Sequence, residues 1–155
     1  MATANEVSDQ YGNNYLLETD YAYILNLPIN HTNILVAVLD SGINYNNVYL
    51  QDSIFTNPNE IADNGIDDDG NGKVDDIRGW DWNSNGDNNP IPESDDHATG
   101  VAGIIGAKFN PYKNHSGLFP SVKILNLRKS GWSNDFALAV RYAVDIAESN
   151  NKRVV

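Results

Sequence analysis

The chain has 155 residues, no cysteine, and 21 acidic against 10 basic side chains, which gives a net charge of −11. This length fits one domain with its own core, the lack of cysteine excludes disulfides, cysteine-ligated metals and a thiol nucleophile, and no apolar run reaches the roughly 20 residues that span a bilayer. The acidic balance argues against nucleic acid as a partner, because phosphate binding requires a basic surface, whereas the oligomeric state is left open.

The first half of the chain contains one clear strand and one clear helix. Residues 1–14 are polar, lack the basic start and apolar stretch of a signal peptide, and are expected to be poorly ordered. The spacing of apolar residues predicts a short helix over 15–27. Residues 34–39 are continuously apolar, which predicts a strand buried on both faces. Small apolar residues from Thr99 onward predict a buried helix.

The last third of the chain repeats this alternation. Residues 122–127 predict a second strand, and Ser133 or Asn134 can cap the helix that follows it. A third apolar run begins at Arg153 and stops at once, so we expect the chain to be the N-terminal portion of a larger domain. The order of elements predicts an α/β fold with a parallel sheet and right-handed crossovers. The expected core-facing stripe of the last helix is Phe136, Val140, Ala143, Val144 and Ala147.

The negative charge is concentrated in one segment. Residues 52–96 carry 13 acidic side chains against Lys73 and Arg78, a balance of −11, while the remaining residues carry 8 of each sign. A block of like charge repels itself and tends to stay disordered unless cations neutralise it.

The centre of this segment has the ligand spacing of a calcium loop. Carboxylates and an amide stand at positions 1, 3, 5 and 9, with glycine at position 6. Calcium takes six to eight oxygen ligands at roughly 2.3 to 2.6 Å, whereas magnesium demands a stricter octahedral geometry and fits less well. The alternative is an Asx-rich turn without metal, since Arg78 stands where an EF-hand has glutamate. The expected ligands are Asp67, Asp69, Asn71, the carbonyl of Lys73, Asp75 and Asp76.

Two further residues are candidates for chemistry. Asp40 directly follows the first predicted strand, at the end where α/β sheets assemble their sites. His97 stands at the head of the small-residue helix. Each alone is more often structural, as a turn former or a surface residue, but together they indicate a site.

Several segments, in this order, resemble the subtilisin-like serine peptidases, the subtilases. VAVLDSGIN is similar to the family's Asp segment and HATGVAGIIGA to its His segment. Residues 57–82 are similar to a calcium-loop insertion of one bacterial-type branch, and 117–128 to the stretch that enters the next strand. The resemblance implies a three-layer, subtilisin-like α/β fold that is incomplete, with a partial peptidase domain over 15–155.

The resemblance also implies a function. It implies a serine endopeptidase that acts on polypeptides, in which Asp40 orients His97, His97 serves as general base, and a serine attacks the peptide carbonyl. Residues Lys129, Ser130 and Gly131 match an edge along which substrate lies as an added strand. A secreted or extracytoplasmic location is implied by the family alone.

The match has gaps that leave alternatives open. No segment of the chain matches the family's Gly-Thr-Ser-Met-Ala type of nucleophile segment, so we expect this polypeptide alone to be inactive. Beside His97, Ala98 and Gly100 replace the family's glycine and histidine. One alternative is a noncatalytic, calcium-binding subtilase-like module that binds peptide or a partner protein. Another is a calcium-stabilised α/β binding domain in which Asp40 and His97 are structural.

Overall fold

The computed structural model describes residues 33–83, 86–109, 116–120, 122–129 and 135–155. The expected poorly ordered residues 1–14 and the expected helix at 15–27 lie outside the described residues.

In the described part of the chain, four parallel strands form one sheet. Strands β1 (Ile34–Asp40), β2 (Gly79–Asp81), β3 (Lys123–Arg128) and β4 (Arg153–Val154) lie in the order β2-β3-β1-β4. Strand β1 pairs with β3 from Leu35 opposite Lys123 to Asp40 opposite Arg128, so the two strands end together. The predicted strands at 34–39 and 122–127 are confirmed to within one residue at each end, whereas β2 was not predicted.

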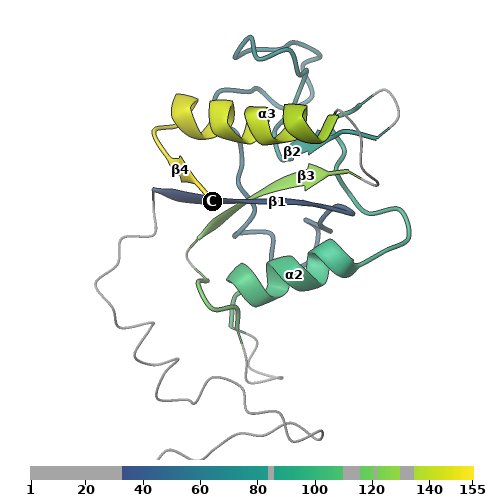
Figure 1. Cartoon of the computed structure of the whole chain (residues 1–155), viewed down its shortest axis with the longest axis vertical. Helices are drawn as coiled ribbons and strands as arrows, with labels where there is room; N and C mark the ends of the chain where they lie inside the picture. The colour runs from purple at the N-terminus through teal and green to yellow at the C-terminus, as the bar shows by residue number, and fades with distance from the viewer. Residues whose placement is uncertain (1–32, 84–85, 110–115, 121, 130–134) are drawn as a thin grey trace, which may run out of the picture. The chain divides into compact units, whose positions relative to one another are not determined.

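Among the residues that the structure describes, two helices cover opposite faces of the sheet. Helix α2 (His97–Gly106) lies on one face and helix α3 (Asp135–Ser149) on the other, which gives three layers (Figure 1). Helix α3 ends in a Schellman motif: Asn151 adopts a positive φ of 52°, and the Lys152 amide donates to the Ala147 carbonyl at 2.8 Å. Neither of these helices has the length and apolar character needed to cross a membrane. The predicted α/β architecture with a parallel sheet is therefore confirmed.

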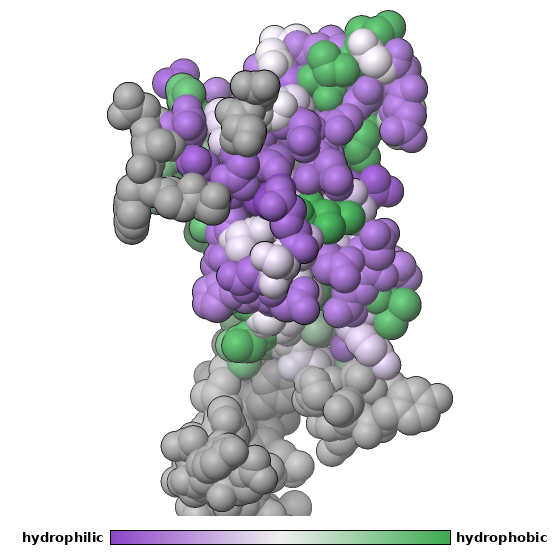
Figure 2. Space-filling model, turned by 90° about the vertical axis from the view of Figure 1, so that its right-hand side faces the viewer, coloured by the Kyte–Doolittle hydropathy of each residue, from purple (hydrophilic) through white to green (hydrophobic). Residues whose placement is uncertain are grey.

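The alternation of side chains along the strands divides the core in two. Leu35, Leu125 and Leu127 pack with buried residues of α3. Val38 and Ile124 point to the other face and pack with buried alanines of α2. Because the period is two, Asp40 follows Val38 onto the face that α2 covers. Figure 2 views the molecule from the side toward which β1 and β3 run, where hydrophilic residues predominate.

The buried stripe of α3 differs from the predicted one. Ala143 and Ala147 are buried as predicted, but Phe136 and Val140 are 39% and 47% exposed. The helix carries two overlapping apolar stripes, and the one that packs includes Tyr142, whose hydroxyl finds a buried acceptor. Packing against the sheet, which helical periodicity alone does not report, decides between the stripes. The buried residues are Ala139, Tyr142, Ala143, Ile146 and Ala147.

Candidate active site

Asp40 and His97 meet where the sheet ends. Asp40 is the last residue of β1 and His97 the first of α2, and His97 Nδ1 lies 2.8 Å from Asp40 Oδ2. The carboxylate is a hydrogen-bond acceptor, so it favours the imidazole tautomer that carries hydrogen on Nδ1. That tautomer leaves Nε2 with a lone pair. The His97 side chain is 66% exposed, which gives other groups access to it.

The Asp40 carboxylate is held in its charged form. Partial burial raises its pKa, but the hydrogen bond from the Ser41 amide to Oδ1 and the contact with His97 outweigh this effect. The net result is a pKa below the ordinary value of 3.8. Asp40 therefore remains an anion that can stabilise a protonated imidazole.

The side chains of Ser41 and Thr99 link the end of β1 to the start of α2 by hydrogen bonds. The Ser41 hydroxyl accepts the amide of Ala98 at 3.3 Å, and the Thr99 hydroxyl accepts the amide of Asn44 at 3.0 Å. The N-cap residue Asp96 makes no side-chain capping bond. The first turn of α2 is thus partly capped by the segment that follows Asp40, and this couples the positions of the two candidate residues.

Gly42 allows the loop that precedes α2 to approach the end of β1. Its φ is 100°, which side-chain-bearing residues rarely adopt. A Cβ atom at this position would lie 2.5 Å from the Pro90 carbonyl oxygen. The glycine in the Asp segment is therefore required for the loop before α2 to pass close to β1.

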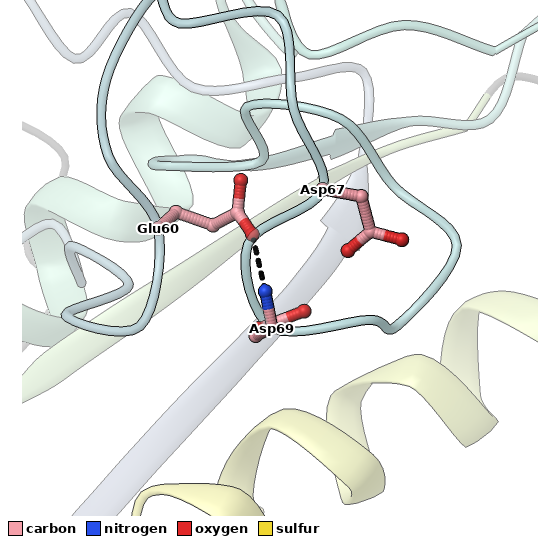
Figure 3. Close-up of side chains that lie close together, drawn as sticks. All are labelled: Glu60, Asp67 and Asp69. Carbon is pink, nitrogen blue, oxygen red and sulfur yellow. Dashed lines mark hydrogen bonds between the residues drawn. The ribbon is translucent and has the colours of Figure 1, made fainter.

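Three carboxylates of the acidic loop gather around one point. Oxygen atoms of Glu60, Asp67 and Asp69 all lie within 4.8 Å of one another (Figure 3). Glu60 is only 8% exposed, and it accepts the amide of Asp69 at 3.0 Å. No cationic side chain in the described part of the chain forms an ion pair with any of the three. These are hard oxygen donors, so the cluster fits a hard cation such as calcium.

The pKa of Glu60 is raised, as expected where carboxylates lie together without a neutralising cation. Burial raises the pKa of Glu60, and the neighbouring carboxylates of Asp76 and Asp69 raise it further. Hydrogen bonds from the amides of Asp68 and Asp69 act in the opposite direction and do not offset the rise. The loop thus brings acidic groups together at an energetic cost that a bound cation would remove.

The carboxylates of two other expected ligands, Asp75 and Asp76, have hydrogen-bond partners of their own. The carboxylate of Asp75 accepts the amides of Asn64 and Gly65, each at 3.0 Å. Asp76 is fully buried, and its carboxylate accepts the Tyr142 hydroxyl at 2.6 Å. The structure therefore brings Asp67 and Asp69 of the expected set together, adds Glu60, and gives Asp75 and Asp76 other partners.

The remaining expected ligands, Asn71 and Lys73, take part in the internal bonding of the loop. Asn71 Oδ1 accepts the Lys73 amide at 2.8 Å, and Asn71 Nδ2 donates to Asp76 at 2.9 Å. The Lys73 ammonium lies 5.0 Å from the ring centroid of Trp80 and 4.8 Å from that of Trp82. These cation–π contacts fasten the acidic loop to β2.

The model of the Subtilase family matches residues 31–155. The chain belongs to the subtilase family. It is 42% identical over 93 residues to subtilisin-like protease 1 of Plasmodium berghei (strain Anka), which covers 58% of this chain and 15% of that protein. It is 46% identical over 73 residues to the protein of the same name from Plasmodium falciparum (isolate 3D7), covering 46% of this chain and 10% of the relative.

A third relative, subtilisin-like protease 1 of Plasmodium vivax, is 44% identical over 78 residues, covering 48% of this subtilase chain and 12% of the relative. The chain thus matches less than a fifth of the length of each of these curated relatives.

The expected substrate edge of the subtilase chain is described only at its first residue. The amide of Lys129 donates to the Asp40 carbonyl at 2.7 Å, which extends the pairing of β3 with β1. Ser130 and Gly131 lie outside the described residues.

Sequence reasoning missed two residues of this region. Glu60 stands seven positions before Asp67, outside the motif, and only the folding of the loop brings it to the cluster. Asn126 is fully buried in β3. The sequence did contain a signal for Asn126, because a polar residue inside the apolar run VKILNL requires hydrogen-bond partners.

Proposed function

We propose that the chain is part of a subtilase serine endopeptidase in which Asp40 and His97 form two members of the catalytic triad. The observation that carries this proposal is the 2.8 Å contact between His97 Nδ1 and Asp40 Oδ2 at the carboxyl end of a parallel sheet. Asp40 fixes the imidazole tautomer and stabilises the imidazolium, and His97 Nε2 takes a proton from the nucleophile and returns it to the leaving amine. The reaction is the hydrolysis of a peptide bond.

Under this proposal, none of the 155 residues supplies the nucleophile. No segment of the 155 residues matches the nucleophile segment of the family. We therefore expect the 155-residue polypeptide to be catalytically silent, because the general base of the triad acts on the hydroxyl of that nucleophile serine. The proposal also places the active protein outside the cytoplasm, which rests on family membership alone.

A serine-directed fluorophosphonate probe tests this proposal on two polypeptides. The product of the longest reading frame that contains this chain should be labelled, and His97→Ala and Asp40→Ala variants of that product should lose most of the labelling. The 155-residue polypeptide should remain unlabelled and should not hydrolyse casein. Phosphonate-sensitive hydrolysis by the 155 residues, or full labelling of the His97→Ala product, would overturn the proposal.

Calcium is the metal that we propose for the acidic cluster. Glu60, Asp67 and Asp69 would hold the ion, which would neutralise their charge and stabilise the loop. Three carboxylates supply three to six oxygens, depending on whether each binds through one oxygen or two, so backbone carbonyls and waters would complete the six to eight that calcium takes. No catalytic step requires the ion.

One observation favours a second candidate, a noncatalytic module that binds peptide or a partner protein. Ala98 and Gly100 depart from the family pattern directly beside His97, and the first of them is fully buried. In this case the full reading frame would carry another residue at the nucleophile position, and its product would bind but not cleave an unstructured polypeptide.

A further inference from the structure

Asn126 is a fully buried amide whose side chain has hydrogen-bond partners in two loops. It lies in β3, with 0% of its surface exposed. Its Oδ1 accepts the amide of Ile43 at 3.0 Å. Its Nδ2 donates to the carbonyl of Ile43 at 3.2 Å and to that of Pro90 at 3.1 Å. Both amide hydrogens and the amide oxygen are therefore in use.

The two loops are those that carry Asp40 and His97. Ile43 follows Asp40 by three residues, and Pro90 precedes His97 by seven. Neither Ile43 nor Pro90 belongs to a strand or helix, so the sheet and the helices supply no regular partners for these backbone groups. A buried backbone group without a partner is unfavourable, so the Asn126 side chain selects the loop arrangement in which all three bonds form.

We propose that Asn126 is a positioning residue that holds Asp40 and His97 in their mutual geometry. It acts through the two loops and touches neither side chain. Gly42 lies between Asp40 and Ile43, and a Cβ atom added to it would lie 2.5 Å from the Pro90 carbonyl oxygen, so little space separates the two loops and a shift of one affects the other. This inference rests on the proposed function, because only that function gives the mutual geometry of Asp40 and His97 a catalytic purpose.

The tautomer of His97 reports on this geometry without requiring catalysis. In the ¹⁵N-labelled 155-residue chain at about pH 8.5, where histidine is ordinarily neutral, long-range proton–nitrogen spectra distinguish Nδ1–H from Nε2–H. His97→Gln assigns the signal. We expect Nδ1–H to predominate in the unaltered chain. In Asn126→Asp, the new carboxylate faces two backbone carbonyls, and we expect the Nδ1–H preference to be lost in the folded protein.

Two further variants separate positioning from stability. Ile124→Val alters another fully buried residue of the same strand and face; it should lower the thermal midpoint and leave the His97 tautomer unchanged. Asn126→Ser is smaller and keeps a hydroxyl, so it serves if Asn126→Asp does not fold. It should also lose the tautomer preference.

The outcomes of this experiment distinguish failure of the positioning proposal from failure of the proposed function. Wild-type imidazole signals in a folded Asn126 variant would overturn the proposal, as would an equal change in Ile124→Val. Failure of both Asn126 variants to fold would also reject it, because the residue would then serve folding alone. Absence of the Nδ1–H preference in the unaltered chain would instead reject the Asp40–His97 pair and with it the proposed function.

Discussion

His97 Nδ1 lies 2.8 Å from Asp40 Oδ2 although 57 positions separate the two residues. The fold produces this contact through one simple relationship: β1 ends at Asp40 on the face that α2 covers, and α2 begins at His97 beside it. The contact has consequences for stability as well as for chemistry.

The free energy of unfolding should contain a pH-dependent contribution from Asp40. Its folded-state pKa lies below the ordinary value of 3.8, so the contribution is present above that value and is lost as the pH falls through the folded pKa. Asp40→Asn should therefore reduce stability at pH 7 and make little difference in strong acid. Urea unfolding of both proteins across this range measures the effect. A double-mutant cycle with His97→Gln isolates the pair, and a coupling energy of zero at pH 7 would contradict the expectation.

Calcium should stabilise the chain through the acidic cluster. At a concentration near 100 times the dissociation constant, binding adds about 2.7 kcal/mol, which corresponds to a rise of roughly 5 to 10 °C in the thermal midpoint for a domain of this size. Differential scanning calorimetry with calcium and with a chelator measures the rise.

A matched pair of variants locates the calcium effect. Asp67→Asn lowers the charge of the cluster and should abolish most of the rise. Asp63→Asn removes the same charge from an exposed residue of the same loop, and its positive φ of 58° suits asparagine. Asp63→Asn should retain the rise; an equal loss in both variants would show that calcium responds to overall charge alone.

Removal of the Lys73 ammonium should change the tryptophan fluorescence. Lys73→Met keeps the length of the side chain but removes the charge that lies over Trp80 and Trp82. Loss of two partly exposed cation–π contacts should cost about 1 kcal/mol and alter the emission of the folded protein. Lys73→Arg keeps a cation over the rings and should restore most of both effects. Identical spectra and stability in Lys73→Met and the unaltered chain would show that the contacts contribute nothing.

Two glycine-to-alanine changes should have opposite effects on stability. Gly42→Ala places a methyl group against the Pro90 carbonyl at a strained φ, and it should lower the free energy of unfolding by about 3 kcal/mol. Gly100→Ala adds a methyl group on the exposed side of α2, where no atom lies within 4 Å, and it should raise this free energy by about 0.5 to 1 kcal/mol. Chemical denaturation measures both, and a stable Gly42→Ala protein would refute the close approach of the two loops.

Two features of the sequence allowed prediction. Long apolar runs indicated the strands, and the Asp and His segments, in that order, indicated Asp40 and His97. Residues 34–39 are apolar on both faces, and residues 122–127 are apolar except for Lys123 and Asn126, because helices cover both faces of the sheet, so their pattern indicated buried parallel strands. Strand β2 has three residues, too few to show a periodicity, and it exists because it pairs with β3.

The acidic loop shows the limit of motif spacing. The motif placed Asp75 and Asp76 among the ligands because their types and positions fit, yet the folded loop uses Asp75 to bind backbone amides and Asp76 to bind Tyr142. Glu60 enters the cluster through a contact that no local pattern encodes. Local spacing thus indicated the acidic segment, while the fold of the loop decides which of its carboxylates lie together.

The bonds between Asn126 and Ile43 join residues that are 83 positions apart. Closing so long a loop costs chain entropy before any contact is gained, so contacts of this range form slowly. We therefore expect the corner that holds Asp40 and His97 to be assembled late on the folding pathway, after β3 has docked beside β1. Substitutions at Asn126 should then accelerate unfolding while leaving the refolding rate nearly unchanged.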